Sequence, residues 1–98
     1  MINLKEEEIE IVKRILSTRF KDKEILIFGS RITDRVKPYS DLDLAIKSKE
    51  KLSLRDIDLT KEEFEESKLN FSVDLMDYDR IPENFKRAID KKHEMMKI

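Results

Sequence analysis

Apolar positions near the start of the chain follow the period of an amphipathic helix. Across residues 4–20 they recur at helical spacing, and the apolar set is Ile9, Val12, Ile15, Leu16 and Phe20. This spacing predicts a helix with one face in the core. Asn3 is expected to cap the helix, and the acidic residues 6–8 suit the positive end of its dipole.

Two further segments have helical character. Residues 53–68 predict a helix whose core-facing positions are Leu54, Ile57 and Phe64. The segment Thr60–Glu63 matches a capping box, so this helix begins either near residue 53 or at Thr60. Pro82 suits the first turn of a last helix. The apolar stripe of that helix is expected to contain Ile81, Phe85, Ile89 and Met96.

Short segments between the helices predict strands. Ile25–Phe28 is a bounded apolar run and is interpreted as a buried strand that ends at the dipeptide Gly29–Ser30. Residues 31–36 predict a short helix. Asp41–Lys47 and Phe71–Asp77 alternate between apolar and polar residues, which is the period of a strand with two different faces.

The order of these elements predicts a fold class. Helix, strand, short helix, strand, helix, strand and helix follow one another along residues 1–98. This order indicates one α/β (α+β) domain with a small three- to four-stranded mixed sheet flanked by helices. A chain of this length leaves no room for a second folded module.

Composition narrows the possible partners and compartments. Charged residues make up 44% of the chain, yet the net charge is only -1, so no general argument for nucleic-acid binding arises. The absence of cysteine excludes disulfides and cysteine-bound zinc. No segment resembles a signal peptide or a membrane-spanning run. We therefore expect a soluble cytoplasmic protein with no membrane partner, for which nucleic acid is not required.

The chain places its single glycine, Gly29, directly before a serine, at the end of a predicted strand. Glycine allows a sharp turn and a close approach of the backbone to a ligand. Exposed amide groups and the Ser30 hydroxyl are suited to hold phosphate oxygens. Arg31 is expected to add positive charge against a triphosphate.

Three carboxylates are candidates for a metal site. Asp41 and Asp43 fall on the same face of a predicted strand, where their charges repel unless a cation lies between them. Mg²⁺ prefers such hard oxygen ligands. Asp74, in the next strand, is the best third ligand, and three carboxylates can hold two ions roughly 3.5–4 Å apart. Asp77 faces the other way, and Asp79 is interpreted as a cap or turn residue.

Each of these features is common by itself, since Gly-Ser often marks a turn and spaced aspartates often mark a solvated strand end. Their combination is more specific. The segments GSR (29–31), SDLDLAI (40–46) and VDLMDYDRIPE (73–83) resemble the polymerase-β-type nucleotidyltransferase superfamily. The chain is most similar to its minimal nucleotidyltransferase (MNT) members, the antitoxins of HEPN/MNT toxin–antitoxin pairs. It departs from them in the spacer at residues 32–34, where members often have small residues.

The resemblance implies a nucleotide-binding and a catalytic set. Gly29 and Ser30 would bind the triphosphate of ATP, and Asp41 and Asp43 would ligate two Mg²⁺ ions. Asp74 would ligate the catalytic ion and help to deprotonate an acceptor hydroxyl. That hydroxyl attacks the α-phosphate, AMP is transferred, and pyrophosphate leaves.

The resemblance also implies a partner. MNT antitoxins transfer AMP to a tyrosine hydroxyl of a HEPN ribonuclease toxin and inactivate it. A chain too small for an acceptor-binding domain suits an acceptor that brings its own binding surface.

Two other functions stay open: an antitoxin that neutralises its toxin by binding alone, and a small-molecule nucleotidyltransferase. Homo- and hetero-oligomers are both compatible with the sequence. Lys37, Tyr39 and Lys47 lie near the aspartates and are weaker site candidates, and His93 is expected on a surface helix.

Overall fold

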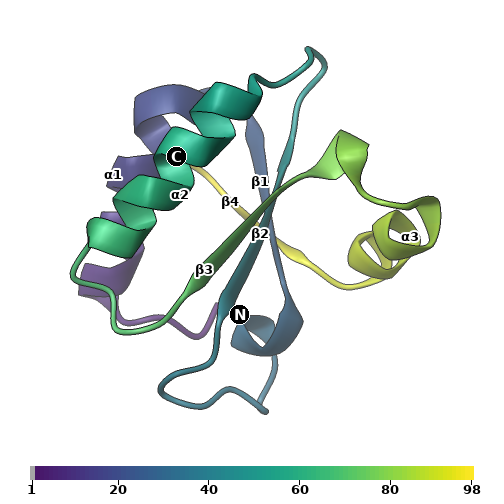
Figure 1. Cartoon of the computed structure of the whole chain (residues 1–98). Coiled ribbons are helices and arrows are strands. Elements are labelled where there is room, and N and C mark those ends of the chain that lie inside the picture. Colours follow the sequence, from purple (N-terminus) through teal and green to yellow (C-terminus); the bar gives the residue numbers. More distant parts are fainter. Residues whose placement is uncertain (1) are drawn as a thin grey trace.

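A computed structural model of the chain describes residues 2–98 and contains a four-stranded sheet with helices on both faces (Figure 1). The elements, in chain order, are α1 (Glu6–Phe20), β1 (Glu24–Phe28), the 3-10 helix η1 (Gly29–Ile32), β2 (Leu42–Lys47), α2 (Leu54–Glu66), β3 (Val73–Asp77), the 3-10 helix η2 (Tyr78–Arg80), α3 (Glu83–Lys91) and β4 (Glu94–Met96). This arrangement confirms the predicted α+β class with a small mixed sheet.

The strand order is β3-β2-β1-β4. β1 runs antiparallel to both β2 and β4, whereas β2 and β3 are parallel. A parallel pair needs a long crossover connection, and α2 supplies it. The register pairs the Cα of Asp43 with that of Phe28 on one side and that of Asp74 on the other. The topology thus gathers residues from three separate segments around the middle of the sheet.

The main core lies between the sheet and the helix pair α1–α2, which covers one face (Figure 1). Alternate residues of the central strands point into it, and the fully buried members are Ile25, Ile27, Leu42, Leu44 and Ile46. The opposite face carries a smaller cluster in which Phe28 and Ala45 pack with Tyr78 and with Ile89 of α3. Only part of this second face is covered by apolar packing, which leaves space there for a site.

The helix starts differ from the sequence prediction. Lys5, not Asn3, precedes α1, and its backbone N–H donates to the Glu8 carboxylate at 2.8 Å. Asn3 instead tethers the start of the chain to the loop after β1, because its side chain donates to the Thr33 carbonyl at 2.8 Å. The prediction of an Asn3 cap is therefore wrong.

α2 begins at Leu54, and the Ser53 hydroxyl caps it by accepting from the Asp56 N–H at 3.3 Å. The alternative start at Thr60 is wrong, since Thr60 is fully buried within the helix and its hydroxyl donates to the Asp56 carbonyl at 2.8 Å. Ile57 and Phe64 face the core as predicted. Leu54 does not: it is 55% exposed in the first turn of the helix.

The last helix is shorter than its apolar stripe predicted. α3 ends at Lys91, and Met96 belongs to the edge strand β4, where it pairs with Ile25. His93 lies between the two elements, with Nδ1 2.8 Å from the Ile89 carbonyl oxygen, rather than on a surface helix. The predicted helix over 31–36 is replaced by the single turn η1, which begins at Gly29. Within the described residues, no helix has the length and apolar character to cross a membrane.

Candidate active site

Gly29 forms the tightest point of the candidate site. Its φ of +79° lies in the left-handed region, which glycine adopts without a steric penalty. A Cβ at this position would lie 2.2 Å from Oδ2 of Asp43, closer than any real contact. The turn after β1 and the carboxylate on β2 are therefore packed directly against each other, and this packing requires glycine.

Asp43 is the central carboxylate. It is half-buried on the sheet face opposite α1 and α2, and the parallel register aligns it with Asp74. Burial, followed by the negative charges of Asp74 and Asp41, raises the pKa of Asp43 to about 6. A raised pKa means that the negatively charged form of Asp43 is disfavoured here unless a nearby positive charge compensates it. Asp74 and Asp41 are thus close enough for their charges to act on Asp43.

The same residues do not form a ready-made metal cluster. In the part of the chain that the structure describes, no group of three His, Cys, Asp or Glu side chains is arranged to hold one ion. Asp41 precedes β2 and is exposed, as is Asp74 on the edge strand β3. The donors nevertheless fit Mg²⁺ in kind, because all are hard carboxylate oxygens and a divalent cation would offset the repulsion around Asp43.

A cavity of about 420 Å³ is lined by Gly29 and Ser30. It connects to the carboxylates only through Gly29, which packs against Asp43, because none of the three aspartates is among its described lining residues. Its apolar wall includes Phe28 and Phe85, whose rings meet edge to face with centroids 5.8 Å apart. The volume lies in the range of small-molecule sites. Gly29 and Ser30 thus line this cavity, and Gly29 also packs against the Asp43 carboxylate.

Arg31 does not face this cavity. Its guanidinium is buried, and its three nitrogens donate to the carbonyls of Ser40, Asn3 and Pro38 at 3.0, 3.1 and 3.1 Å. The group also lies 4.2 Å from the centre of the Phe71 ring. The expectation that Arg31 adds charge against a triphosphate is wrong, because its donors are already used to hold the loop before Asp41 to the N-terminal segment.

The weaker candidates lie around the site without joining its centre. The Lys47 ammonium lies 4.9 Å from the centroid of the Tyr78 ring. Tyr39 is 74% exposed on the loop before Asp41, and the N–H of Lys37 donates to the Ser40 hydroxyl at 2.8 Å. The Lys47 side chain thus packs on Tyr78, whereas the Lys37 backbone helps to shape the loop and the Tyr39 side chain is exposed to solvent.

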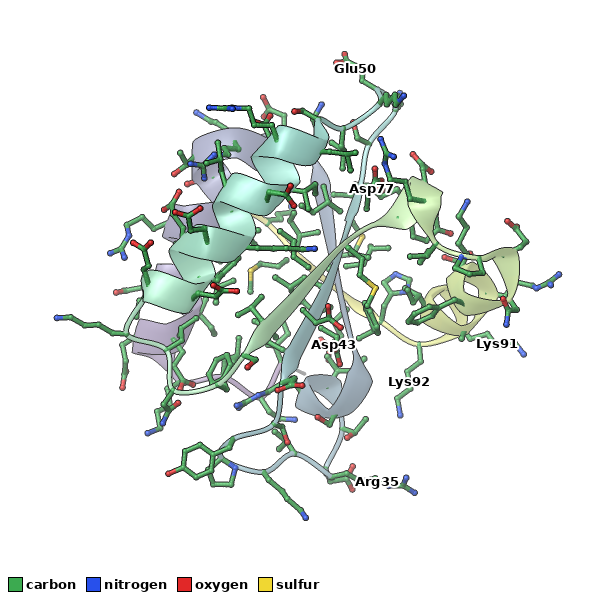
Figure 2. The ribbon with its side chains drawn as sticks, viewed as in Figure 1. Arg35, Asp43, Glu50, Asp77, Lys91 and Lys92 are labelled. Carbon is green, nitrogen blue, oxygen red and sulfur yellow. The ribbon has the colours of Figure 1, made fainter. Side chains whose placement is uncertain are left out.

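Sequence reasoning missed two cations at the cavity, Arg35 and Lys92. Arg35 lies only a few residues beyond Ser30 in a polar loop, where a basic residue gives no signal of its own. Lys92 is far away in the sequence and reaches the cavity only because α3 ends beside η1 (Figure 2). Only the tertiary fold brings the two together.

Comparison with known proteins agrees with this geometry. A family model described as "Polymerase beta, Nucleotidyltransferase" matches residues 10–97. The chain is also 44% identical over 90 residues to "Probable protein adenylyltransferase MntA" of Haemophilus influenzae, covering 92% of this chain and 79% of that protein. The matched region contains the Gly29 turn, both strands that carry aspartates, and α3. The chain belongs to the polymerase-β-type nucleotidyltransferases and groups with their minimal members.

Proposed function

We propose that this protein is a Mg²⁺-dependent protein adenylyltransferase that acts as an antitoxin, transferring AMP from ATP to a tyrosine hydroxyl of a HEPN ribonuclease toxin. The observation that carries the proposal is the packing of the Gly29 turn against the Asp43 carboxylate. This packing brings the backbone of the Gly29 turn, which would bind phosphate in the proposal, next to the Asp43 carboxylate. The name of the similar Haemophilus protein, a probable protein adenylyltransferase, supports a protein acceptor.

In this proposal, each residue has a separate task. Gly29 and Ser30 hold phosphate oxygens of ATP, and Asp41 and Asp43 hold two Mg²⁺ ions together with Asp74. The ions supply charge that offsets the developing negative charge on the phosphates. Asp74 is exposed at the sheet surface, where an incoming hydroxyl can reach it.

The proposed reaction is a single displacement at phosphorus. The acceptor oxygen forms a bond to the α-phosphorus of ATP, and the bond from that phosphorus to the α–β bridging oxygen breaks. Pyrophosphate leaves with the bond's electron pair. The acceptor proton goes to the Asp74 carboxylate. Most of the rate comes from positioning and electrostatic stabilisation rather than from covalent chemistry by the protein.

We infer that residues 1–98 work as a single minimal domain in the cytoplasm, where ATP is present. The described elements form a cavity beside Gly29 and Ser30 but no separate module for an acceptor. A folded protein acceptor brings its own binding surface to the open side of Asp74. The toxin therefore fits this site better than a small molecule does.

A binding antitoxin without catalysis is the second candidate. One observation favours it: the three carboxylates are not arranged as a three-ligand metal cluster within residues 2–98. In that case the protein would neutralise its toxin by occlusion, and the raised pKa of Asp43 would reflect only its burial and the charges of Asp74 and Asp41.

The deciding experiment is transfer from α-labelled ATP, with Mg²⁺, to proteins of the source cells. Wild type is compared with Asp41→Ala/Asp43→Ala. We expect a labelled protein band with wild type alone, and mass spectrometry of that band names the acceptor. A partner that co-purifies with both versions but never carries label would favour occlusion. Label that appears only in the small-molecule fraction would favour a small-molecule transferase.

A further inference from the structure

The acidic centre needs nearby positive charge to accept ATP. Asp41, Asp43 and Asp74 act together there, and the triphosphate adds several more negative charges. Arg31, the nearest cation in the sequence, is buried against three carbonyls. Side chains that add positive charge beyond that of the proposed Mg²⁺ ions would therefore come from elsewhere in the fold.

Arg35 and Lys92 are placed for this task. Both line the cavity beside Gly29 and Ser30, and both also line an adjoining hollow of about 510 Å³. Both are exposed, and neither forms an ion pair with a residue in the described range 2–98. Figure 2 shows Lys92 extending from the junction of α3 and β4 toward the side of η1 on which Arg35 lies.

Hydrogen bonds hold the backbone at each cation, at Arg35 to the glycine turn and at Lys92 to the end of α3. The Thr33 hydroxyl donates to the Ser30 carbonyl at 2.9 Å and accepts from the Arg35 N–H at 3.1 Å, so it ties Arg35 to the turn. The Lys92 N–H donates to the Ile89 carbonyl at 3.1 Å and ends α3. The long side chains thus start from defined points on two walls of one cavity.

We infer that Arg35 and Lys92 bind the β- and γ-phosphates of ATP and make this site selective for a nucleoside triphosphate over a monophosphate. This inference rests on the proposed function, because it assumes that the nucleotide lies beside Asp43. The α-phosphate lies at the carboxylates, and the tail of the triphosphate runs past Ser30 between the two cations. The same cations hold pyrophosphate as it leaves.

The negative charge of Asp34 allows a separate test of phosphate binding between Arg35 and Lys92. Its carboxylate borders the hollow that Arg35 and Lys92 share, so it repels a phosphate held between them. Replacing it by asparagine removes that repulsion without adding a new positive charge. Asp34→Asn is therefore expected to tighten ATP binding about two- to fivefold.

The test measures equilibrium binding to the full chain with Mg²⁺, using a non-cleavable ATP analogue, AMP and inorganic tripolyphosphate as probes. We expect Arg35→Ala and Lys92→Ala each to weaken binding of the ATP analogue and of tripolyphosphate roughly tenfold, and the double variant about 100-fold. AMP binding should change less than about twofold. Lys91→Ala is the matched control, because this exposed neighbour lies on the outer side of α3 (Figure 2).

Three outcomes would overturn the inference. One is unchanged binding of the ATP analogue by the double variant, another is an equal loss for AMP and the ATP analogue, and the third is an equal effect of Lys91→Ala. Transfer activity distinguishes the two proposals. If the double variant selectively loses tripolyphosphate binding but wild type transfers AMP to no acceptor, the proposed function alone is contradicted. Transfer with normal ATP affinity in the double variant would sink this inference alone.

Discussion

The α-carbon of Gly29 faces the Asp43 carboxylate so closely that a methyl group there would lie 2.2 Å from Oδ2. This relationship joins the turn directly after β1 to the start of β2, next to the Phe28–Asp43 pair of the antiparallel register. This close packing explains why the single glycine of the chain is at position 29. A side chain would either displace the carboxylate or open the turn.

Gly29→Ala should therefore destabilise the protein and abolish nucleotide binding. The left-handed φ and the overlap with Asp43 together are expected to lower the free energy of unfolding by about 2–4 kcal/mol.

A double-mutant cycle separates the two causes. In an Asp43→Ala background the overlap disappears, because the Asp43 Cβ lies 3.5 Å from the added carbon. There the cost should fall to about 1 kcal/mol, from the backbone alone. Equal costs in both backgrounds, by urea denaturation, would show that the contact does not matter.

The raised pKa of Asp43 makes stability depend on pH. The folded chain binds this proton more tightly than the unfolded chain between the ordinary value of 3.8 and about 6. The free energy of unfolding should therefore fall as pH rises through that window. Asp43→Asn removes the cost, so with a metal chelator present it should stabilise the protein near neutral pH by about 1 kcal/mol, after allowance for solvent screening. The gain should vanish below about pH 3.8, where this carboxyl group is protonated in both the folded and the unfolded chain.

Thermal unfolding at both pH values, with and without the substitution, measures this difference. Asp58→Asn on the exposed side of α2 is the control and should change stability little at either pH. A destabilising Asp43→Asn at neutral pH would mean that the carboxylate makes favourable contacts which outweigh the repulsion from Asp41 and Asp74.

Arg31 is expected to serve stability rather than nucleotide binding. Arg31→Lys loses the fork of donors that reaches three carbonyls and should lower the free energy of unfolding by about 2–3 kcal/mol. Arg35→Lys, at an exposed cation with no such bonds, should change stability by less than about 0.5 kcal/mol. Unaltered stability of Arg31→Lys, together with weaker ATP binding, would instead restore the role that the sequence suggested.

Alanine substitutions at Met95 and Met96 test whether residues 94–96 form the strand β4, which the sequence did not predict. Met96 points into the main core and is 5% exposed, whereas Met95 faces the other way and is 53% exposed. Met96→Ala should therefore cost about 2–3 kcal/mol, and Met95→Ala less than about 0.5 kcal/mol. Similar costs for both, measured by chemical denaturation, would contradict the alternation of β4.

Sequence reasoning performed best where a local pattern and the tertiary environment agree. The alternation around Leu42 and Leu44 indicated both the strand and its buried face. The parallel register, which the sequence did not predict, aligns Asp43 with Asp74. Gly29 was identifiable because a lone glycine at a strand end usually marks a turn or a close approach.

The failures came from contacts between distant segments. Met96 matched a helical stripe, but pairing with Ile25 satisfies its backbone in a strand. The fate of Arg31 depended on Asn3, Pro38 and Ser40, and no periodicity encodes that arrangement. Lys92 likewise reaches the cavity only because the end of α3 packs beside the Gly29 turn, far away in the sequence. Long-range packing decides these positions, and local propensity does not.

The central claim is that the Gly29 turn and its carboxylates transfer AMP. The most direct measurement compares α-labelled with γ-labelled ATP on the same protein acceptor, using wild type and Asp74→Asn. We predict that wild type attaches the α-label to the acceptor and releases the γ-label as pyrophosphate, and that Asp74→Asn attaches at least about 100-fold less. A γ-label on the acceptor, or full transfer of the α-label by Asp74→Asn, would contradict the account.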